Sequence, residues 1–160
     1  MENKINHARV SFDACSMNEG FARMVVMGFL MEMNPTMDEL QDVKTAVSEA
    51  VTNAIIHGYE VDEAVNVSGQ ASPQVEMHCE REGNKITIVV EDQGVGIADI
   101  DEARNPFFTT KPEAERSGMG FTFMETFMDE VQVFSKVGKG TRVEMTKYIG
   151  CDATKEQSGE

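Results

Sequence analysis

Apolar residues recur at helical spacing in two stretches near the start of the chain. Met17 to Met33 is rich in Met, Val, Phe and Leu at this spacing, which predicts a buried helix. Asn34-Pro35-Thr36 interrupts the pattern, and Thr36 followed by Glu39 forms a candidate capping box. The helix that starts there is expected to end near Gly58 and carries these apolar residues: Leu40, Val43, Val47, Val51, Ala54 and Ile55.

Alternation of apolar and polar residues with period two predicts the strands. Gln74 to Glu80 and Lys85 to Glu91 alternate in this way and are joined by a short turn, which predicts a hairpin. A second hairpin is predicted from Val131 to Ser135 and Thr141 to Tyr148, and His7 to Asp13 alternates more weakly.

The remaining segments complete the predicted order. Glu60 to Pro73 is expected to be a polar loop, Asp92 to Thr110 a glycine-containing loop, and Gly118 to Met128 a helix opened by glycines. This order favours an α+β fold, a two-layer sandwich with helices on one face of a mixed, mainly antiparallel sheet. We expect one domain over residues 1–150, followed by a polar tail over residues 151–160.

Charge and composition narrow the functional classes. A formal net charge of -14 over 160 residues argues against a nucleic-acid binder, because phosphate contacts need clustered Lys and Arg. It fits a basic partner or an ordinary solvated acidic surface. No apolar run is long enough to span a bilayer and no apolar signal region begins the chain, so a cytoplasmic protein without a membrane partner is expected. The widely spaced Cys15, Cys79 and Cys151 suggest reduced thiols.

The helix that ends near Gly58 carries polar residues along one face. Glu49, Asn53 and His57 follow each other at intervals of four residues, so they lie on the same side of that helix. The Asn53 amide oxygen is a suitable hard ligand for Mg²⁺, and Glu49 could orient a water or accept a proton from an attacking hydroxyl. An amphipathic helix with a polar edge is the alternative.

A strand that ends in an acid and two glycines is the second candidate. Asp92 closes the alternating run and is followed by Gly94 and Gly96 in the order Asp-Gln-Gly-Val-Gly. Glycines allow a ligand to approach the backbone closely, and an aspartate there could accept a hydrogen bond from the exocyclic amine of adenine. An ordinary Asp-Gly turn is the alternative, and neither the Rossmann nor the Walker A pattern is present.

Glycines also open the last predicted helix. Gly118 and Gly120 would expose backbone N–H groups to an anion such as phosphate, and the helix dipole would favour the same ligand. Thr109, Thr110 and Lys111 precede them and could close over a triphosphate. A flexible loop that enters a helix is the alternative.

Taken together, these segments resemble a known order of motifs. An acid–amide helix, a DxGxG strand end, a hydroxyl-rich loop and a GxG helix start resemble the GHKL (Bergerat-type) ATP-binding fold over about Thr36 to Tyr148. Four stretches also resemble the family of sporulation anti-sigma F factors, stage II sporulation protein AB: NEGFARMVV, PTMDEL, VSEAVTNAIIHGY and EARNPFFTTKPEAERSGMGFTFMETFMDEV.

The resemblance implies a role for each candidate residue. It makes Asn53 the magnesium ligand, Glu49 the general base and Asp92 the residue that contacts adenine. It places Glu19 and Arg23 on a helix that contacts protein partners; a solvated helix edge is the alternative for these two. The remaining residues would shape the pocket or belong to an ATP lid, with Arg116 near the γ-phosphate: Gly94, Gly96, Thr109, Thr110, Lys111, Arg116, Gly118 and Gly120.

The implied function is that of a homodimeric, ATP- and Mg²⁺-dependent serine-protein kinase that also sequesters a sigma factor. Its phosphoryl acceptor would be a small anti-anti-sigma antagonist. A general stress-response anti-sigma kinase and a non-catalytic ATP-dependent binding module remain alternatives. The catalytic domain of a sensor histidine kinase is disfavoured, because no dimerisation helix with an acceptor His precedes the first motif. The stretch from Glu60 to Glu91 is longer than the family pattern, and Gln93 stands where an acid is usual.

Overall fold

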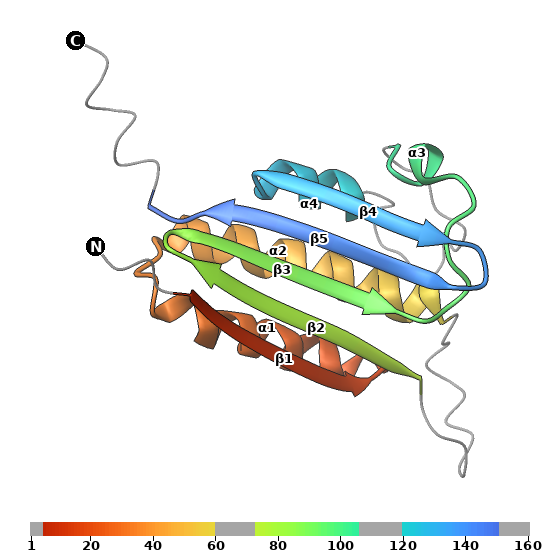
Figure 1. Ribbon diagram of the computed structural model, residues 1–160, viewed down its shortest axis with the longest axis horizontal. Coiled ribbons are helices and arrows are strands. Elements are labelled where there is room, and N and C mark those ends of the chain that lie inside the picture. The colour runs from red at the N-terminus through yellow and green to blue at the C-terminus, as the bar shows by residue number, and fades with distance from the viewer. Residues whose placement is uncertain (1–4, 60–72, 106–119, 151–160) are drawn as a thin grey trace.

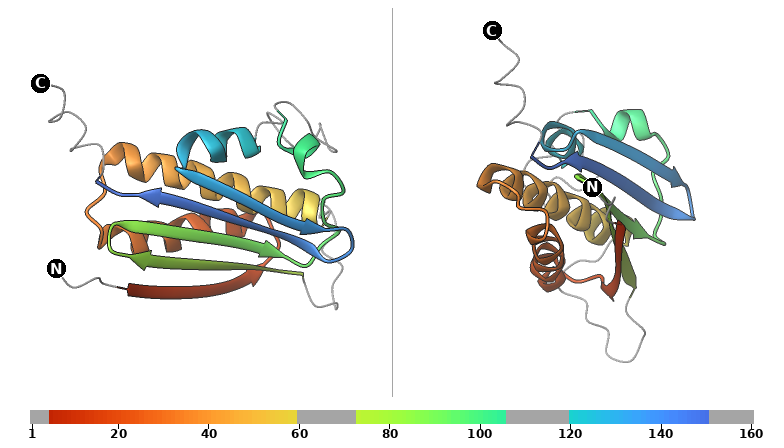
Figure 2. Two further views of the ribbon diagram at one scale, coloured as in Figure 1. Left: turned by 45° about the horizontal axis from the view of Figure 1, so that its top comes forward. Right: turned by 60° about the vertical axis from the view of Figure 1, so that its left-hand side comes forward.

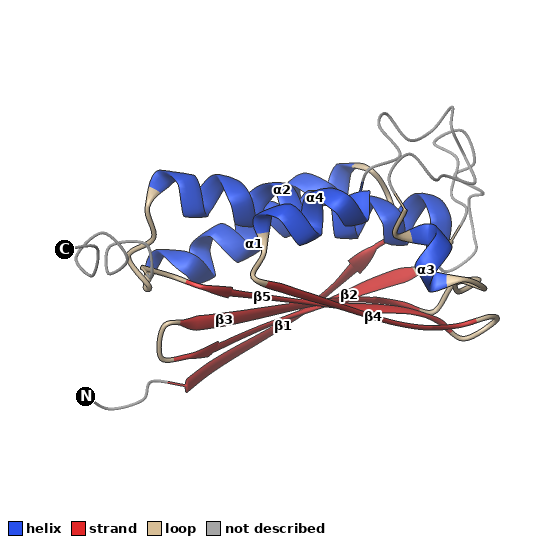
Figure 3. Ribbon diagram, turned by 90° about the horizontal axis from the view of Figure 1, so that it is seen from above, coloured by secondary structure: helices blue, strands red, loops and turns tan. Residues whose placement is uncertain are grey.

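The computed structural model describes residues 5–59, 73–105 and 120–150 and has two layers (Figures 1 and 3). One layer is a twisted sheet in the order β1-β2-β3-β5-β4, and every pair of neighbours is antiparallel. The strands are β1 (Ile5–Asp13), β2 (Gln74–Glu82), β3 (Lys85–Asp92), β4 (Glu130–Lys136) and β5 (Gly140–Tyr148).

Helices cover one face of this sheet (Figure 3). They are α1 (Met17–Met31), α2 (Met37–Asn53), which continues into the π-helical turn η1 (Ala54–Gly58), the short α3 (Ile100–Ala103), and α4 (Gly120–Phe127). The predicted α+β sandwich is therefore confirmed, with a sheet that is antiparallel in all its described pairings. The loop predicted after Gly58, the segment before Gly120 and the tail fall largely in residues 60–72, 106–119 and 151–160, outside the described residues.

The core lies between α2 and the central strands. Val43, Val47 and Val51 of α2 are fully buried, as the helical spacing predicts. Alternate residues of β2 and β3 face them from the sheet: Val75, Met77, Cys79, Ile86, Ile88 and Val90. Burial raises the pKa of the Cys79 thiol to about 12, so it is an unreactive core residue. Among the described helices, none is both long and apolar enough to cross a bilayer.

The prediction that α1 is a buried helix is wrong for half of its surface. Ala22, Val26 and Leu30 are fully buried where α1 packs against α2 and the β1–β2 side of the sheet (Figure 2). The opposite face exposes large apolar side chains: Met17, Phe21, Met24 and Met31. The methionines of α1 are all exposed or half-buried, but methionine counts as apolar in the pattern, so the spacing gave no sign of the exposed side.

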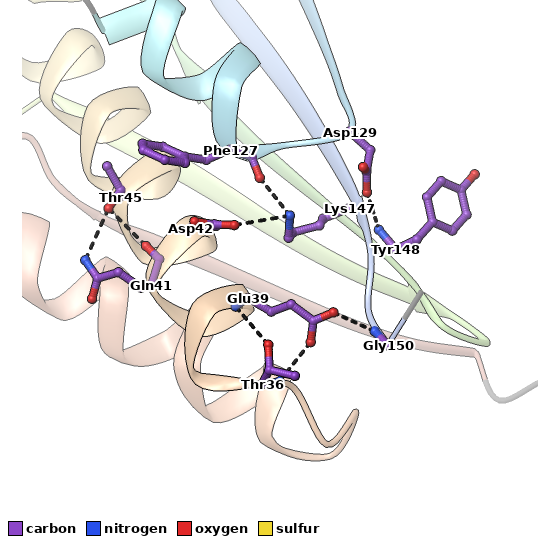
Figure 4. Close-up of polar contacts among 10 residues, drawn as sticks. All are labelled: Thr36, Glu39, Gln41, Asp42, Thr45, Phe127, Asp129, Lys147, Tyr148 and Gly150. Atoms are coloured by element: carbon purple, nitrogen blue, oxygen red, sulfur yellow. Dashed lines mark hydrogen bonds and ion pairs between the residues drawn. The ribbon is translucent and has the colours of Figure 1, made fainter. Parts of the chain in front are cut away.

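The predicted capping box at the start of α2 is confirmed and has a further partner. The Glu39 N–H donates to Thr36 Oγ1 (3.2 Å), and Glu39 Oε2 accepts from the Thr36 N–H (2.8 Å). Its other oxygen, Oε1, accepts from the Gly150 N–H at 2.7 Å (Figure 4). Glu39 is only 4% exposed, so its bonds satisfy a buried carboxylate and tie α2 to the residues after β5.

Lys147 makes a second connection at the same end of the molecule (Figure 4). Its ammonium donates to the carbonyl oxygen of Phe127 at the end of α4 (2.8 Å) and lies 3.6 Å from Asp42 Oδ2 of α2. A cation at the C-terminal end of a helix is favoured by the helix dipole. Lys147 therefore holds α2, α4 and β5 together at the end opposite the cavity described next.

Candidate functional site

A cavity of about 360 Å³ lies between the C-terminal part of α2, the end of β3, α3 and the start of α4. Figure 1 shows α3 and the ends of α2 and β3 gathered at one end of the molecule. Four of the predicted site residues line this cavity: Asn53, Asp92, Gly96 and Gly120. Its walls are otherwise mostly apolar, as is typical of small-molecule sites, with Val90, Ile97 and Val143 among them.

Asp92 is the buried acid of the cavity, with 5% of its surface exposed. Its carboxylate accepts hydrogen bonds from the backbone N–H groups of Gly94 (Oδ1, 2.9 Å) and Thr141. Burial raises the pKa of Asp92 to about 6, although the two N–H groups oppose this shift and the charge of Glu91 adds to it. At neutral pH Asp92 is thus a desolvated carboxylate, which is a strong acceptor for a ligand N–H group.

Gly58 and Gly94 bring the end of the π-helical turn against the loop that follows Asp92. A Cβ on Gly94 would lie 1.9 Å from the Gly58 carbonyl oxygen, and one on Gly58 would lie 2.8 Å from Asp92 Oδ1. The Gly58 carbonyl oxygen accepts from the Val95 N–H at 2.8 Å. Glycines permit this close approach, and Gly58, Asp92 and Val95 all line the cavity there.

The other side of the same loop rests on the β4–β5 hairpin. Gly96 has a φ of +76°, and a Cβ there would lie 2.2 Å from the Lys136 carbonyl oxygen. The Ile97 N–H donates to Ser135 Oγ at 2.7 Å, and the Gly138 N–H donates to the Val95 carbonyl at 2.8 Å. The loop over 92–97 is therefore fixed from two directions.

Glu49 and Asn53 lie next to the start of α4. A Cβ on Gly120 would lie 3.1 Å from Asn53 Nδ2 and 3.2 Å from Glu49 Oε2, so the helix start, the acid and the amide are in near contact. An added methyl group would be tight against both side chains, which would have to shift by a few tenths of an ångström to admit it. His57, predicted on the same helix face, also lines the cavity.

The structure thus brings together Glu49, Asn53, Asp92, Gly94, Gly96 and Gly120 around one cavity. The predicted lid and phosphate residues lie outside the described residues: Thr109, Thr110, Lys111, Arg116 and Gly118. Sequence analysis missed Gly58, Tyr59 and Thr141. Gly58 and Tyr59 stood in a quoted motif but had no recognisable chemistry, and nothing in the sequence indicates that Thr141 lies beside Asp92.

Glu19 and Arg23 form an ion pair on α1, with Arg23 Nη1 2.6 Å from Glu19 Oε1. Arg23 Nη1 also donates to Ser48 Oγ at 3.3 Å, and the hydroxyl of Thr52 donates to Glu19 Oε2 at 3.3 Å. Both side chains remain about one-third exposed, Arg23 at 33% and Glu19 at 31%. The pair is therefore held in place by α2 and still faces solvent, and neither of its residues lines the cavity.

The side chains around the cavity determine which metal ions and ligands it can bind. Among the described residues, no group of three His, Cys, Asp or Glu side chains could hold a metal ion by itself. Glu49 and Asn53 supply hard oxygen atoms, which suit Mg²⁺ when a ligand such as a phosphate supplies the rest of the coordination. The arrangement can therefore bind a molecule with an N–H donor at the Asp92 end and anionic oxygens at the α4 end.

Comparison with known proteins agrees with this geometry. Residues 15–147 match the family described as the histidine kinase-like ATPase domain. An anti-sigma F factor of Clostridium perfringens is 56% identical over 149 residues, which are 93% of this chain and 99% of that protein. An anti-sigma F factor of Anoxybacillus flavithermus is 51% identical over 144 residues, 90% of this chain and 93% of that protein.

A solved structure shares the fold. The crystal structure of the RsbU and RsbW domains of a Mycobacterium tuberculosis protein superposes with a TM-score of 0.62 at 18% identity, over 90% of this chain and 32% of that longer chain. The chain therefore belongs to the histidine kinase-like ATPase domain family and, within it, to the anti-sigma F factors.

Proposed function

We propose that this protein is an anti-sigma factor that binds ATP with Mg²⁺ in the cavity, holds a sporulation sigma factor, and phosphorylates a serine of its anti-anti-sigma antagonist. The observation that carries the proposal is the placement of the buried Asp92 carboxylate and the Glu49–Asn53 pair around one cavity. The names of the similar proteins from Clostridium and Anoxybacillus support the anti-sigma part.

Adenine is the ligand group that best matches the Asp92 end. The carboxylate would accept a hydrogen bond from the exocyclic amine of the base. The apolar walls, including Val90 and Val143, would cover its faces. Guanine presents a carbonyl where adenine presents the amine, so two acceptors would meet and the base would be rejected.

Phosphates would then extend toward the start of α4. Asn53 would hold Mg²⁺ through its amide oxygen, with Glu49 beside it. Bound there, Mg²⁺ would neutralise charge that develops on the phosphates during transfer. The hydroxyl oxygen of the acceptor serine would bond to the γ-phosphorus while the bond from that phosphorus to ADP breaks. The Glu49 carboxylate would take the proton that the serine hydroxyl loses.

Protein partners would bind to α1. We also propose that the protein is a homodimer in which α1 stays accessible to these partners. Met17, Phe21 and Met24 are exposed on this helix, close to the Glu19–Arg23 ion pair. Exposed large apolar side chains around a charged pair are typical of protein interfaces, and methionine adapts to different partners. The surplus of acidic residues would attract a basic sigma region.

One set of assays tests the proposal. The protein is mixed with γ-labelled ATP, Mg²⁺ and an anti-anti-sigma protein that carries an acceptor serine, and sigma-factor binding is measured separately with ATP present. We expect transfer of label to the antagonist and a stable complex with the sigma factor. Absence of transfer to every such antagonist would reject the kinase activity, and absence of sigma binding would reject the anti-sigma activity.

A Glu49→Gln variant separates the kinase from a non-catalytic ATP-dependent binding module. Because the amide keeps the size of the side chain but cannot accept the serine proton, ATP affinity should stay within about twofold while transfer falls about 10²- to 10⁴-fold. Unchanged transfer would remove Glu49 from the role of base. Sigma binding by this variant shows whether nucleotide occupancy alone supports the complex.

A further inference from the structure

Tyr59 lies where the π-helical turn meets the ends of β2 and β3. Its hydroxyl accepts a hydrogen bond from the Gln93 N–H at 2.7 Å and donates to the Gln74 carbonyl oxygen at 2.6 Å. Its own N–H donates to the Ala54 carbonyl oxygen at 3.1 Å, which fixes the residue at the end of the turn. The hydroxyl of Tyr59 thus bridges the backbone of β2 to the residue that follows β3, and the backbone of Tyr59 is bonded to the π-helical turn.

The register of the hairpin shows what this bridge replaces. β2 and β3 pair from Glu82↔Lys85 to Glu76↔Glu91, and the same register would place Gln74 opposite Gln93. Gly83, with a φ of 62°, begins a two-residue turn, so Glu82 and Lys85 form a hydrogen-bonded pair. Such pairs recur at every second position, so Gln74 and Gln93 would bond directly in a regular ladder.

The Tyr59 hydroxyl therefore stands between two groups that would otherwise close the ladder. Asp92 pairs with Thr141 of β5 on its other side, so the end of β3 stays attached to β5. On the β2 side the chain is held open, and the loop turns toward the π-helical turn, where the Val95 N–H reaches the Gly58 carbonyl oxygen. This departure of the chain brings Gly94 to the position from which its N–H donates to Asp92.

We propose that Tyr59 is a positioning residue for nucleotide selection: by bridging the Gln93 N–H to the Gln74 carbonyl oxygen, it sets the loop that holds the Asp92 carboxylate toward the base. This inference rests on the proposed binding of an adenine nucleotide. Tyr59 acts through Asp92 and does not itself touch the nucleotide.

The chemistry of the phenol suits this role. A neutral hydroxyl both donates and accepts, whereas a phenylalanine ring can do neither. Burial raises the pKa of Tyr59 above its ordinary value; the hydrogen bond from the Gln93 N–H opposes this shift, and the charges of Asp92, Glu76 and Glu91 add to it, so the group remains protonated at neutral pH. The bridge uses the backbone N–H of Gln93, and its side chain lies near Glu91 instead, so the bridge does not depend on the residue type at this position.

The test compares two tyrosine-to-phenylalanine variants, because the chain has only two tyrosines. Tyr59→Phe removes the bridging hydroxyl, and Tyr148→Phe makes the same change at a residue of β5 that is 43% exposed. Affinities for ATP and for purine riboside triphosphate, which lacks the 6-amino group, are measured by calorimetry. Amide hydrogen exchange of Gln93, Gly94 and Ile88 is followed in the nucleotide-free protein.

We expect Tyr59→Phe to weaken ATP binding about two- to tenfold, which is the effect of one hydrogen bond. The affinity for purine riboside triphosphate should stay unchanged. The preference for the 6-amino group should fall by the same factor. Exchange at Gln93 and Gly94 should accelerate at least about tenfold while Ile88, in the strand centre, stays protected. Tyr148→Phe should alter none of these values.

Two results would overturn the inference. Equal loss of affinity for both nucleotides would make Tyr59 a general support of the fold, and unchanged exchange at Gln93 and Gly94 would show that the hydroxyl does not hold the loop. If the unaltered protein binds no adenine nucleotide, the proposed function fails, and the exchange measurement still decides whether Tyr59 positions the loop.

Discussion

The backbone at Gly94 lies so close to the Gly58 carbonyl oxygen that a Cβ on Gly94 would come within 1.9 Å of it. The Gly94→Ala variant must therefore push the loop away from η1. This shift would break the Val95 N–H bond to Gly58 and move the N–H that supports Asp92. We expect ATP affinity to fall at least tenfold and the free energy of unfolding to fall by about 1–3 kcal/mol, measured by calorimetry and urea denaturation.

Gly28→Ala is the matched control for this glycine substitution. Gly28 lies inside α1, and a Cβ there would meet nothing within 4 Å. Because alanine is the better helix former, the free energy of unfolding should rise by about 0.5–1 kcal/mol with ATP affinity unchanged. Equal behaviour of the two variants would show that the contact at Gly94 is not tight.

Asp92→Asn should stabilise the ligand-free protein at neutral pH. The pKa of Asp92 is about 6 in the folded state, against an ordinary value of 3.8, so the folded state binds more protons than the unfolded state between these values. The contribution of Asp92 to the free energy of unfolding is therefore fully present below about pH 4 and is lost as the pH rises through about 6. After allowing for partial solvent screening, we expect the asparagine variant to gain about 1–2 kcal/mol at pH 7.5 and nothing below pH 4.

ATP should not raise the free energy of unfolding of the same variant. An asparagine can present its NH₂ group to the base, and two donors would then face each other. Urea denaturation between pH 4 and 8, with and without ATP and Mg²⁺, tests both statements together. A variant that is less stable at pH 7.5, or that is stabilised by ATP as much as the unaltered protein, would contradict the role of Asp92.

Sequence reasoning succeeded where the determinants are local. The capping box of Thr36 and Glu39 needs residues three positions apart, and the hairpin β2–β3 needs alternation around one turn; both are present as predicted. The grouping of Asn53 with Asp92 was predicted because the order of motifs resembles a known fold. Spacing alone left ordinary alternatives open for each of them.

The features that were missed depend on long-range packing. Nothing local to Gly58 signals that its carbonyl oxygen accepts from Val95, and nothing at Thr141 signals that its N–H reaches Asp92. The raised pKa of Asp92 likewise follows from burial by residues of other elements. The exposed face of α1 was missed because a Met-rich helix has the same apolar pattern whether a partner or the core covers it.

Lys147→Met should weaken the end of the molecule opposite the cavity. The variant loses the hydrogen bond to the Phe127 carbonyl oxygen and leaves Asp42 without its cation. Because Lys147 is only 12% exposed, we expect a loss of about 1–2 kcal/mol in the free energy of unfolding, with ATP affinity unchanged within about twofold.

Adding Asp42→Asn should recover part of the Lys147→Met loss, because the double variant no longer holds an unpaired carboxylate near the helix ends. Urea denaturation of the two single variants and the double variant measures this coupling. Strictly additive losses would show that the two side chains do not interact, despite their separation of 3.6 Å.

Arg23→Ala should affect protein partners and leave the nucleotide site intact. Its side chain is one-third exposed, and neither Arg23 nor its partners Glu19 and Ser48 line the cavity. Truncating a charged interface residue commonly costs 1–3 kcal/mol, so we expect sigma-factor affinity to fall at least tenfold, measured by calorimetry with ATP present. ATP affinity should not change.

Arg9→Ala is the control, because it makes the same change of charge on an exposed residue of β1. The affinity of this variant for the sigma factor should stay within about twofold of that of the unaltered protein. If both arginine variants lose affinity equally, overall charge governs the complex and the α1 surface is not the contact.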